Sequence, residues 1–212
     1  MSFNLQELQE YISLAKDIVT ILSALTAAII AVLGLHTWKK QLKGKTEYEL
    51  ARKLLRAVYK VRDAIRLVRN AFMSAGEISQ SLQEANIKTD QFAPRFDAIS
   101  QGALYQRRWE KVQDALSELD LEAFEAEVIW GREVREKLKP LRKNVSTLLG
   151  KIQLYLELLK TPHRDTSNER IVQELVRVIH EVSEDPSKDS FTAEITGSVR
   201  QIEDYLKPHL KL

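Results

Sequence analysis

The sequence contains no cysteine, and in 212 residues it has only seven glycines and five prolines. Without cysteine the chain can form no disulfide framework, no thiolate metal site and no thiol nucleophile. The scarcity of helix-breaking residues, together with a charged fraction of 29 %, favours long amphipathic helices over a sheet-rich fold. Runs that alternate between apolar and polar residues are too short to build a sheet. The composition therefore predicts an all-α protein.

Recognisable catalytic motifs are also missing. None of the four histidines belongs to an HExxH motif or follows a glutamate by three residues, which excludes the usual zinc-protease and di-iron helix motifs. There is no GxSxG, and Gly150-Lys151 lacks the upstream glycine of a phosphate-binding loop, because Val145 stands there. The carboxylates of residues 118–127 are distributed around a helix rather than gathered on one face. We therefore predict no enzymatic activity, no cofactor and no bound metal.

One long apolar run dominates the N-terminal part. Residues 18–38 contain no Asp, Glu, Lys or Arg, and a helix of this length spans roughly 30 Å, about the hydrocarbon thickness of a bilayer. Trp38 closes the run at an expected membrane interface, and Lys39 and Lys40 follow directly. A buried core helix of a soluble protein is the alternative, but such a helix seldom lacks a polar stripe. A cleaved signal peptide is disfavoured, because the preceding flank is acidic and no small-residue cleavage site follows.

The distribution of charge predicts an orientation. Residues 39–70 carry eleven Lys or Arg and three Asp or Glu, whereas residues 1–38 have a net charge of −2. The positive-inside rule then places residue 39 onward in the cytoplasm and the N-terminus outside. The predicted parts are an outer or interfacial segment over residues 1–17, a transmembrane helix over 18–38 and a cytoplasmic helical domain over 39–212.

Small and hydroxyl residues recur on one face of the predicted transmembrane helix, at spacings of three and four. Such a face lets helix backbones approach closely in lipid, where packing drives association. We expect a homo-oligomer of packed helices, which can enclose a narrow pore lined by Thr20, Ser23 and Thr26. The alternative is a lone anchor whose alanines have no role. The residues expected to pack or to line the pore are Thr20, Ser23, Ala24, Ala27, Ala28, Ala31 and Gly34.

A new helix is predicted after Gly44, because Thr46 and Glu49 form a capping box. Its apolar residues, from Leu54 to Phe72, alternate by four and three in the manner of a coiled-coil seam. The basic residues around this seam predict contacts with anionic lipid headgroups, with nucleic acid ranked second; a solvated outer face is the alternative for any single one. The residues expected in these contacts are Lys39, Lys40, Lys43, Lys45, Arg52, Arg56, Arg66 and Arg69.

The rest of the chain predicts further helices separated by polar or proline-containing breaks. The predicted elements are a short helix after Ser81 and longer helices over residues 94–116, 120–161, 166–182 and 191–208. Pro140 should kink the second of these longer helices rather than end it. The expected fold is one N-terminal transmembrane helix followed by an antiparallel cytoplasmic bundle of about five helices. A coiled-coil assembly of several chains is the competing arrangement.

The stretch TWKKQLKGKT (37–46), continued by LARKLLRAVYKVRDAIRLVRN (50–70), resembles a group of uncharacterised bacterial single-pass membrane proteins. In layout the chain is similar to the membrane-pore accessory proteins of RNA-targeting CRISPR systems. Those proteins have one N-terminal membrane helix and a HEPN-like helical body, and they assemble as a ring pore. HEPN ribonucleases separate an Arg and a His by four to six residues, whereas His180 follows Arg177 by three. The resemblance therefore implies a pore but no nuclease.

We expect a self-assembling protein of the bacterial inner membrane that acts on membrane permeability or signalling, in stress or in anti-phage defence. The alternative is a membrane-tethered scaffold that recruits a cytoplasmic protein or nucleic acid without catalysis. A third hypothesis is a degenerate HEPN-like RNA binder. The expected partners are further copies of the chain, a bilayer with anionic headgroups and a cytoplasmic protein, with RNA ranked below them.

Overall fold

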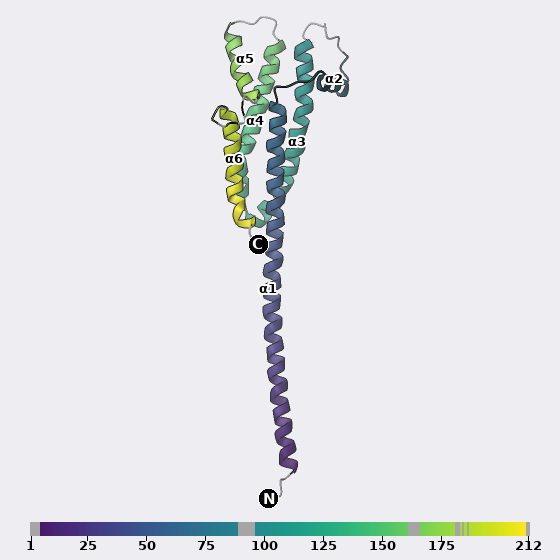
Figure 1. The fold of residues 1–212 in the computed structure, drawn as a ribbon, viewed down its shortest axis with the longest axis vertical. Coiled ribbons are helices and arrows are strands. Elements are labelled where there is room, and N and C mark those ends of the chain that lie inside the picture. Colours follow the sequence, from purple (N-terminus) through teal and green to yellow (C-terminus); the bar gives the residue numbers. More distant parts are fainter. Residues whose placement is uncertain are drawn as a thin grey trace. The chain divides into compact units, whose positions relative to one another are not determined.

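The structure is a computed structural model that describes residues 5–88, 96–160, 166–180, 183, 185 and 187–210. Within these residues the chain forms six α-helices and one short 3-10 helix, and no strand (Figure 1). The predicted all-α fold is confirmed to this extent. The chain divides into two compact units: residues 1–47, with 212, and residues 48–211. Each unit is described by itself.

Helix α1 runs from Leu5 to Arg69 without interruption, so the predicted break after Gly44 is wrong. The hydroxyl of Thr46, expected to cap a new helix, instead donates to the carbonyl oxygen of Leu42 at 3.0 Å. A glycine inside a helix costs only about 1 kcal/mol relative to alanine, which the surrounding turns tolerate. The capping-box pattern therefore does not mark a helix start here.

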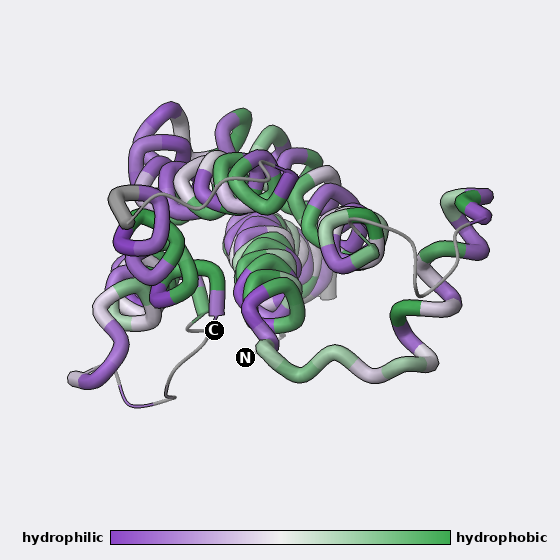
Figure 2. The backbone as a smooth tube through the Cα atoms, turned by 90° about the horizontal axis from the view of Figure 1, so that it is seen from above, coloured by the Kyte–Doolittle hydropathy of each residue, from purple (hydrophilic) through white to green (hydrophobic). Residues whose placement is uncertain are grey.

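The second unit contains residues 48–69 of α1 and all later elements. Within single turns of its helices, hydrophobic residues are followed by hydrophilic ones, as expected for amphipathic helices (Figure 2). The elements that follow α1 are α2 (Ala75–Glu84), α3 (Phe96–Trp130), α4 (Glu133–Lys160), α5 (Thr166–Ile179), α6 (Ser190–Leu206) and the 3-10 helix η1 (Lys207–Leu210).

The boundary between α3 and α4 differs from the prediction. A helix end near residue 116 and a new start at Asp120 were expected, but α3 continues to Trp130. Asp120 lies inside α3 and forms an ion pair with Arg142 of α4, so its carboxylate pairs across the two helices and caps neither. Gly131 ends α3, because its φ of +81° is a left-handed conformation that favours glycine.

The start of α2 also differs from the prediction. The helix begins at Ala75, before Ser81, and Ser74 is its N-cap. The Ser74 side chain accepts a hydrogen bond from the backbone N–H of Glu77 at 3.1 Å. Ser81 is buried inside the helix, where its hydroxyl donates to the carbonyl oxygen of Glu77. Two predicted helix boundaries, a start at Pro94 and an end at Thr161, lie outside the described residues.

The last two helices lie close to their predicted ranges. Helix α5 begins at Thr166 as predicted, and its expected end near residue 182 lies outside the described residues. Helix α6 is capped by Asp189, whose side chain accepts a hydrogen bond from the backbone N–H of Thr192. Pro208 follows its last turn, inside η1.

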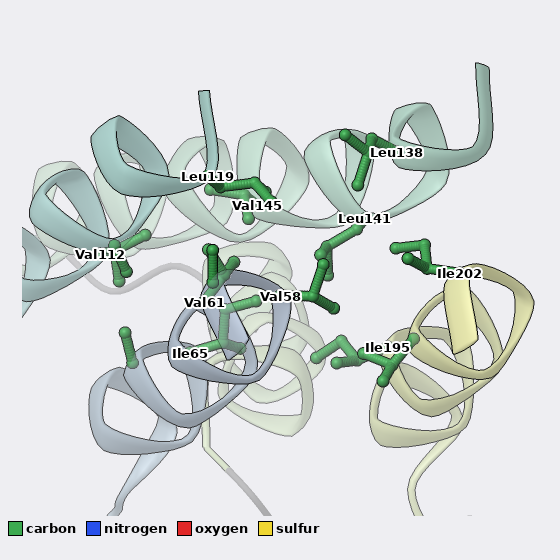
Figure 3. Packing of buried hydrophobic residues seen from close by; sticks show 14 of the residues in the cluster. Val58, Val61, Ile65, Val112, Leu119, Leu138, Leu141, Val145, Ile195 and Ile202 are labelled. Atoms are coloured by element: carbon green, nitrogen blue, oxygen red, sulfur yellow. The ribbon is translucent and has the colours of Figure 1, made fainter. Parts of the chain in front are cut away.

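The predicted seams form the core of the second unit. In α1 the seam from Leu54 to Val68 is fully buried, whereas Phe72 is exposed because the helix ends before it. The α4 seam from Val134 to Tyr155 is buried too, and Pro140 lies inside that helix. Figure 3 shows these side chains meeting those of α3 and α6. Both seams are thus buried within a single chain, and each fully buried Leu, Ile or Val contributes roughly 1.5–3 kcal/mol to its stability.

Candidate functional site: the apolar segment of helix α1

The apolar segment of α1, residues 18–38, exposes its large hydrophobic side chains. Their exposed fraction ranges from 49 % at Ile18 to 69 % at Val32, and every residue of the segment is exposed. A core helix of a soluble protein would be mostly buried. Among the described residues, α1 is the one helix that is long and apolar enough to cross a membrane.

The apolar segment has two different faces. At 3.6 residues per turn, the seven small residues predicted to pack occupy an arc of roughly 140° of the helix surface. The large side chains from Ile18 to Leu33 lie on the remaining surface, because α1 is continuous through the segment. The helix therefore presents one smooth face and one bulky face, while packing through the smooth face stays a prediction. The smooth face consists of Thr20, Ser23, Ala24, Ala27, Ala28, Ala31 and Gly34.

Three hydroxyls of the segment, those of Thr20, Ser23 and Thr26, are hydrogen-bonded inside the helix. Each donates to the backbone carbonyl oxygen four residues earlier, at 2.7 to 2.8 Å. A hydroxyl satisfied in this way can face lipid or another helix without needing water. These side chains therefore permit a dry helix contact as well as a pore. The bonds run from Thr20 to Lys16, from Ser23 to Val19 and from Thr26 to Leu22.

Seven of the eight basic residues predicted to contact headgroups or nucleic acid are exposed. Four of them follow the apolar segment within α1, at Lys39, Lys40, Lys43 and Lys45. The other three, Arg52, Arg56 and Arg66, lie on the exposed side of α1 in the second unit. Their contacts with lipid or nucleic acid stay predictions.

Arg69 is the eighth of these residues, and its predicted surface role is wrong. Its side chain is 1 % exposed and forms an ion pair with Asp189 at 2.8 Å. It also donates to the hydroxyl of Thr192 at 2.7 Å and to the backbone carbonyl oxygens of Val178 and His180 at 2.8 and 3.2 Å. Arg69 thus fastens the end of α1 to the end of α5 and the start of α6.

Arg108 of α3 plays a similar part for the segment between α1 and α2. This buried guanidinium donates to the carbonyl oxygens of Asn70 and Phe72 at 2.6 and 2.8 Å. It also forms two hydrogen bonds with Glu77, and this contact lowers the pKa of the Glu77 carboxyl. Arg108 lies on the buried face of α3, three residues after Tyr105 and four before Val112, and this spacing is a signal by which the sequence could have revealed it. Arg69 follows the seam residue Val68 directly, so the seam spacing does not single it out.

His180 lies between these two arginines. Its Nε2 is 3.1 Å from the hydroxyl of Tyr105. Burial lowers the pKa of His180, and the charges of Arg108 and Arg69 lower it further. Burial also raises the pKa of the Tyr105 hydroxyl well above its usual range. The pair therefore stays uncharged at neutral pH, and the carboxylates nearby, Glu77 and Asp189, are each paired with an arginine.

No protein-family model, curated protein or solved structure matches this chain. In the part of the chain that the structure describes, no three His, Asp or Glu residues gather as a metal site would require. The Arg, His and Tyr cluster is saturated by contacts that hold helix ends together. The exposed apolar segment of α1 has no such structural explanation.

Proposed function

We propose that this protein is a membrane-anchored, self-assembling helical protein whose residues 18–38 cross a bilayer. The observation that carries the proposal is the exposure of every large apolar side chain from Ile18 to Leu33. Exposed apolar surface costs roughly 25 cal/mol per Å² in water, and soluble monomers rarely expose contiguous patches above a few hundred Å². A bilayer covers this surface on all sides, and the helix satisfies its own backbone hydrogen bonds there.

The orientation of the proposed span follows from the flanking charges. Lys39, Lys40, Lys43 and Lys45 follow the apolar segment, and the residues before it are acidic on balance. These cations favour the cytoplasmic side and the anionic headgroups there. The second unit is then a cytoplasmic domain of a bacterial inner-membrane protein, with the N-terminus outside.

Self-assembly is proposed to use the smooth face of the apolar segment. Small residues such as Ala28 and Ala31 permit close backbone approach, and the back-bonded hydroxyls leave no polar group that demands water. The output of the assembly is a change of membrane permeability or a signal, in stress or anti-phage defence. The helices can pack through this face without enclosing water, so assembly does not by itself imply a pore. A conductance measurement on reconstituted protein tests whether the assembly forms one.

The mass of the full-length protein in mild detergent, measured by light scattering, tests self-assembly. We expect a defined oligomer for the natural sequence and a smaller species for the Ala28→Leu, Ala31→Leu variant, because the added bulk separates the helices. The matched control is Leu22→Phe, Ile29→Phe, which adds bulk to the other face and should leave the mass unchanged. A monomer, or an oligomer indifferent to the alanine substitutions, contradicts the proposal.

A membrane-tethered scaffold is the second candidate. It is favoured by the exposed apolar residues on α3 of the second unit, which offer a docking surface outside the apolar segment. Replacement of residues 18–38 by an unrelated membrane helix separates the two candidates. A scaffold keeps its cellular activity after the exchange, whereas an assembly driven by the smooth face loses it.

A further inference from the structure

A cavity of about 380 Å³ lies between helices α3 and α4 of the second unit. Its lining residues on α3 run from Gly102 to Gln113 at spacings of three and four, so they share one side of that helix. The lining residues on α4 run from Leu149 to Leu156 in the same way. The volume is within the range of small-molecule pockets, about 300–1,000 Å³. We call this space the α3–α4 cavity.

The floor of the α3–α4 cavity is apolar and partly aromatic. Tyr105 and Ile152 are buried in it, whereas Trp109 and Leu156 are only half-buried. The hydroxyl of Tyr105 already contacts His180, so this residue offers the cavity its ring alone. The half-buried indole of Trp109 is therefore a surface on which an apolar or aromatic group can lie.

The rim of the α3–α4 cavity consists of four exposed polar residues, Gln106, Glu110, Gln113 and Gln153. None of their side chains has a hydrogen bond or ion pair within the described part of the chain. Glu110 is the one charged residue among the described residues that line the cavity. The cavity thus offers one carboxylate, three carboxamides and an indole ring to a ligand.

This set of groups selects a ligand by its charge. An anion would face the Glu110 carboxylate with no cation in the lining to offset it. An ammonium group instead donates charge-assisted hydrogen bonds to that carboxylate and is attracted by the face of Trp109. The side-chain carbonyl oxygens of the glutamines accept its remaining N–H bonds.

We propose that the α3–α4 cavity binds a small organic ammonium ion with an apolar or aromatic body. The body lies on the floor against Trp109, and the charged head lies at the rim beside Glu110. A helix of a partner protein fits this surface less well, because such a helix is held by large apolar anchors and the four exposed lining residues of the rim are all polar.

Three probes that share one ring and differ in charge test the proposal: benzylammonium, benzyl alcohol and benzoate. Isothermal titration calorimetry measures their binding to the full-length protein in an uncharged detergent, with detergent alone as the blank. We expect saturable binding of benzylammonium at one site per chain and no saturable binding of benzoate. Benzyl alcohol should bind at least roughly tenfold more weakly, because it lacks the charge-assisted hydrogen bond. Equal binding of the three probes, or no saturable binding of benzylammonium, overturns the proposal.

Glu110→Gln tests the proposed charge contact, because it removes the charge and keeps the shape of the side chain. It should weaken benzylammonium binding by roughly tenfold and leave benzyl alcohol binding unchanged. The matched control is Glu125→Gln, which changes an exposed glutamate of α3 outside the cavity and should leave both affinities unchanged. Equal benzylammonium affinities of the two variants would contradict the site.

Gly102→Leu tests the location by filling the cavity. Gly102 lines the cavity inside α3, and open space surrounds it, so a larger side chain there occupies the ligand volume without a clash. Leucine also favours a helix more than glycine does, so the unfolding midpoint should not fall. We expect this variant to lose benzylammonium binding, and undiminished binding would place the ligand elsewhere. The titration does not depend on assembly, so a monomer that binds benzylammonium refutes the proposed function but supports this site.

Discussion

At the scale of single residues, the second unit depends on two buried arginines that hold helix ends. Arg69 contributes an ion pair with Asp189 and three further hydrogen bonds, and its guanidinium lies over the Phe191 ring. No local sequence rule places a guanidinium in a core, since long charged residues are almost never fully buried unless paired. The partner, Asp189, is 120 residues away in the sequence. The surface role predicted for Arg69 therefore failed because its partner is visible only in three dimensions.

Replacement of Arg69 should be strongly destabilising. Arg69→Met removes the ion pair of the buried Asp189 carboxylate, and breaking a buried pair in this way costs about 3–5 kcal/mol. The measurement is the free energy of unfolding of the full-length protein in detergent. Arg52→Met, an exposed arginine on the same helix, is the control and should change that free energy by less than about 0.5 kcal/mol. Equal effects of the two substitutions would contradict the structural role of Arg69.

His180 should make stability depend on pH. Its folded-state pKa lies below the unfolded value of 6.5, so the unfolded chain binds the proton more readily. The free energy of unfolding therefore falls as pH drops below about 6.5, by at most about 1.4 kcal/mol per unit for this group. His180→Gln should reduce this fall when unfolding midpoints are compared between pH 7 and pH 5. An unchanged pH profile in the variant would show that His180 is not the titrating group.

At the scale of elements, buried seams were predicted better than helix ends. The four-three spacing of α1 and α4 identified core residues correctly, because burial of an amphipathic face follows directly from helical periodicity. The predictions of helix ends were wrong where a polar residue can either cap a helix or bond elsewhere. Thr46 bonds back to its own helix and Asp120 pairs with Arg142, although both resemble N-caps in the sequence. The local sequence does not decide between those uses.

The turn between α3 and α4 gives a prediction at this scale. Gly131→Ala should destabilise the protein by about 1 kcal/mol, because a φ of +81° is unfavourable for residues with a Cβ. Gly150→Ala is the matched control: Gly150 lies inside α4, and open space surrounds its added methyl group. That substitution should stabilise by roughly 0.5–1 kcal/mol. Thermal unfolding of both variants tests the pair, and a stabilising Gly131→Ala would contradict the assigned turn.

At the scale of the whole molecule, the chain joins one apolar segment with one self-contained bundle. The sequence predicted the apolar segment from composition alone, because 21 residues in a row without Asp, Glu, Lys or Arg are long enough to cross a bilayer as a helix. The structure adds that the side chains of this segment are exposed, whereas the bundle buries its own seams. It also shows Leu121, Phe124 and Val128 exposed on α3, which the spacing of core residues does not predict because these side chains face outward. The proposed assembly uses the smooth face of α1.

The most direct measurement is the accessibility of single cysteines to a membrane-impermeant maleimide in intact bacterial spheroplasts. Glu10→Cys precedes the apolar segment, and Ser187→Cys lies on the exposed surface of the second unit. We predict that Glu10→Cys reacts in intact spheroplasts, whereas Ser187→Cys reacts only after lysis. Protein recovered in the soluble fraction, or labelling of both sites from the same side, would contradict a membrane span over residues 18–38.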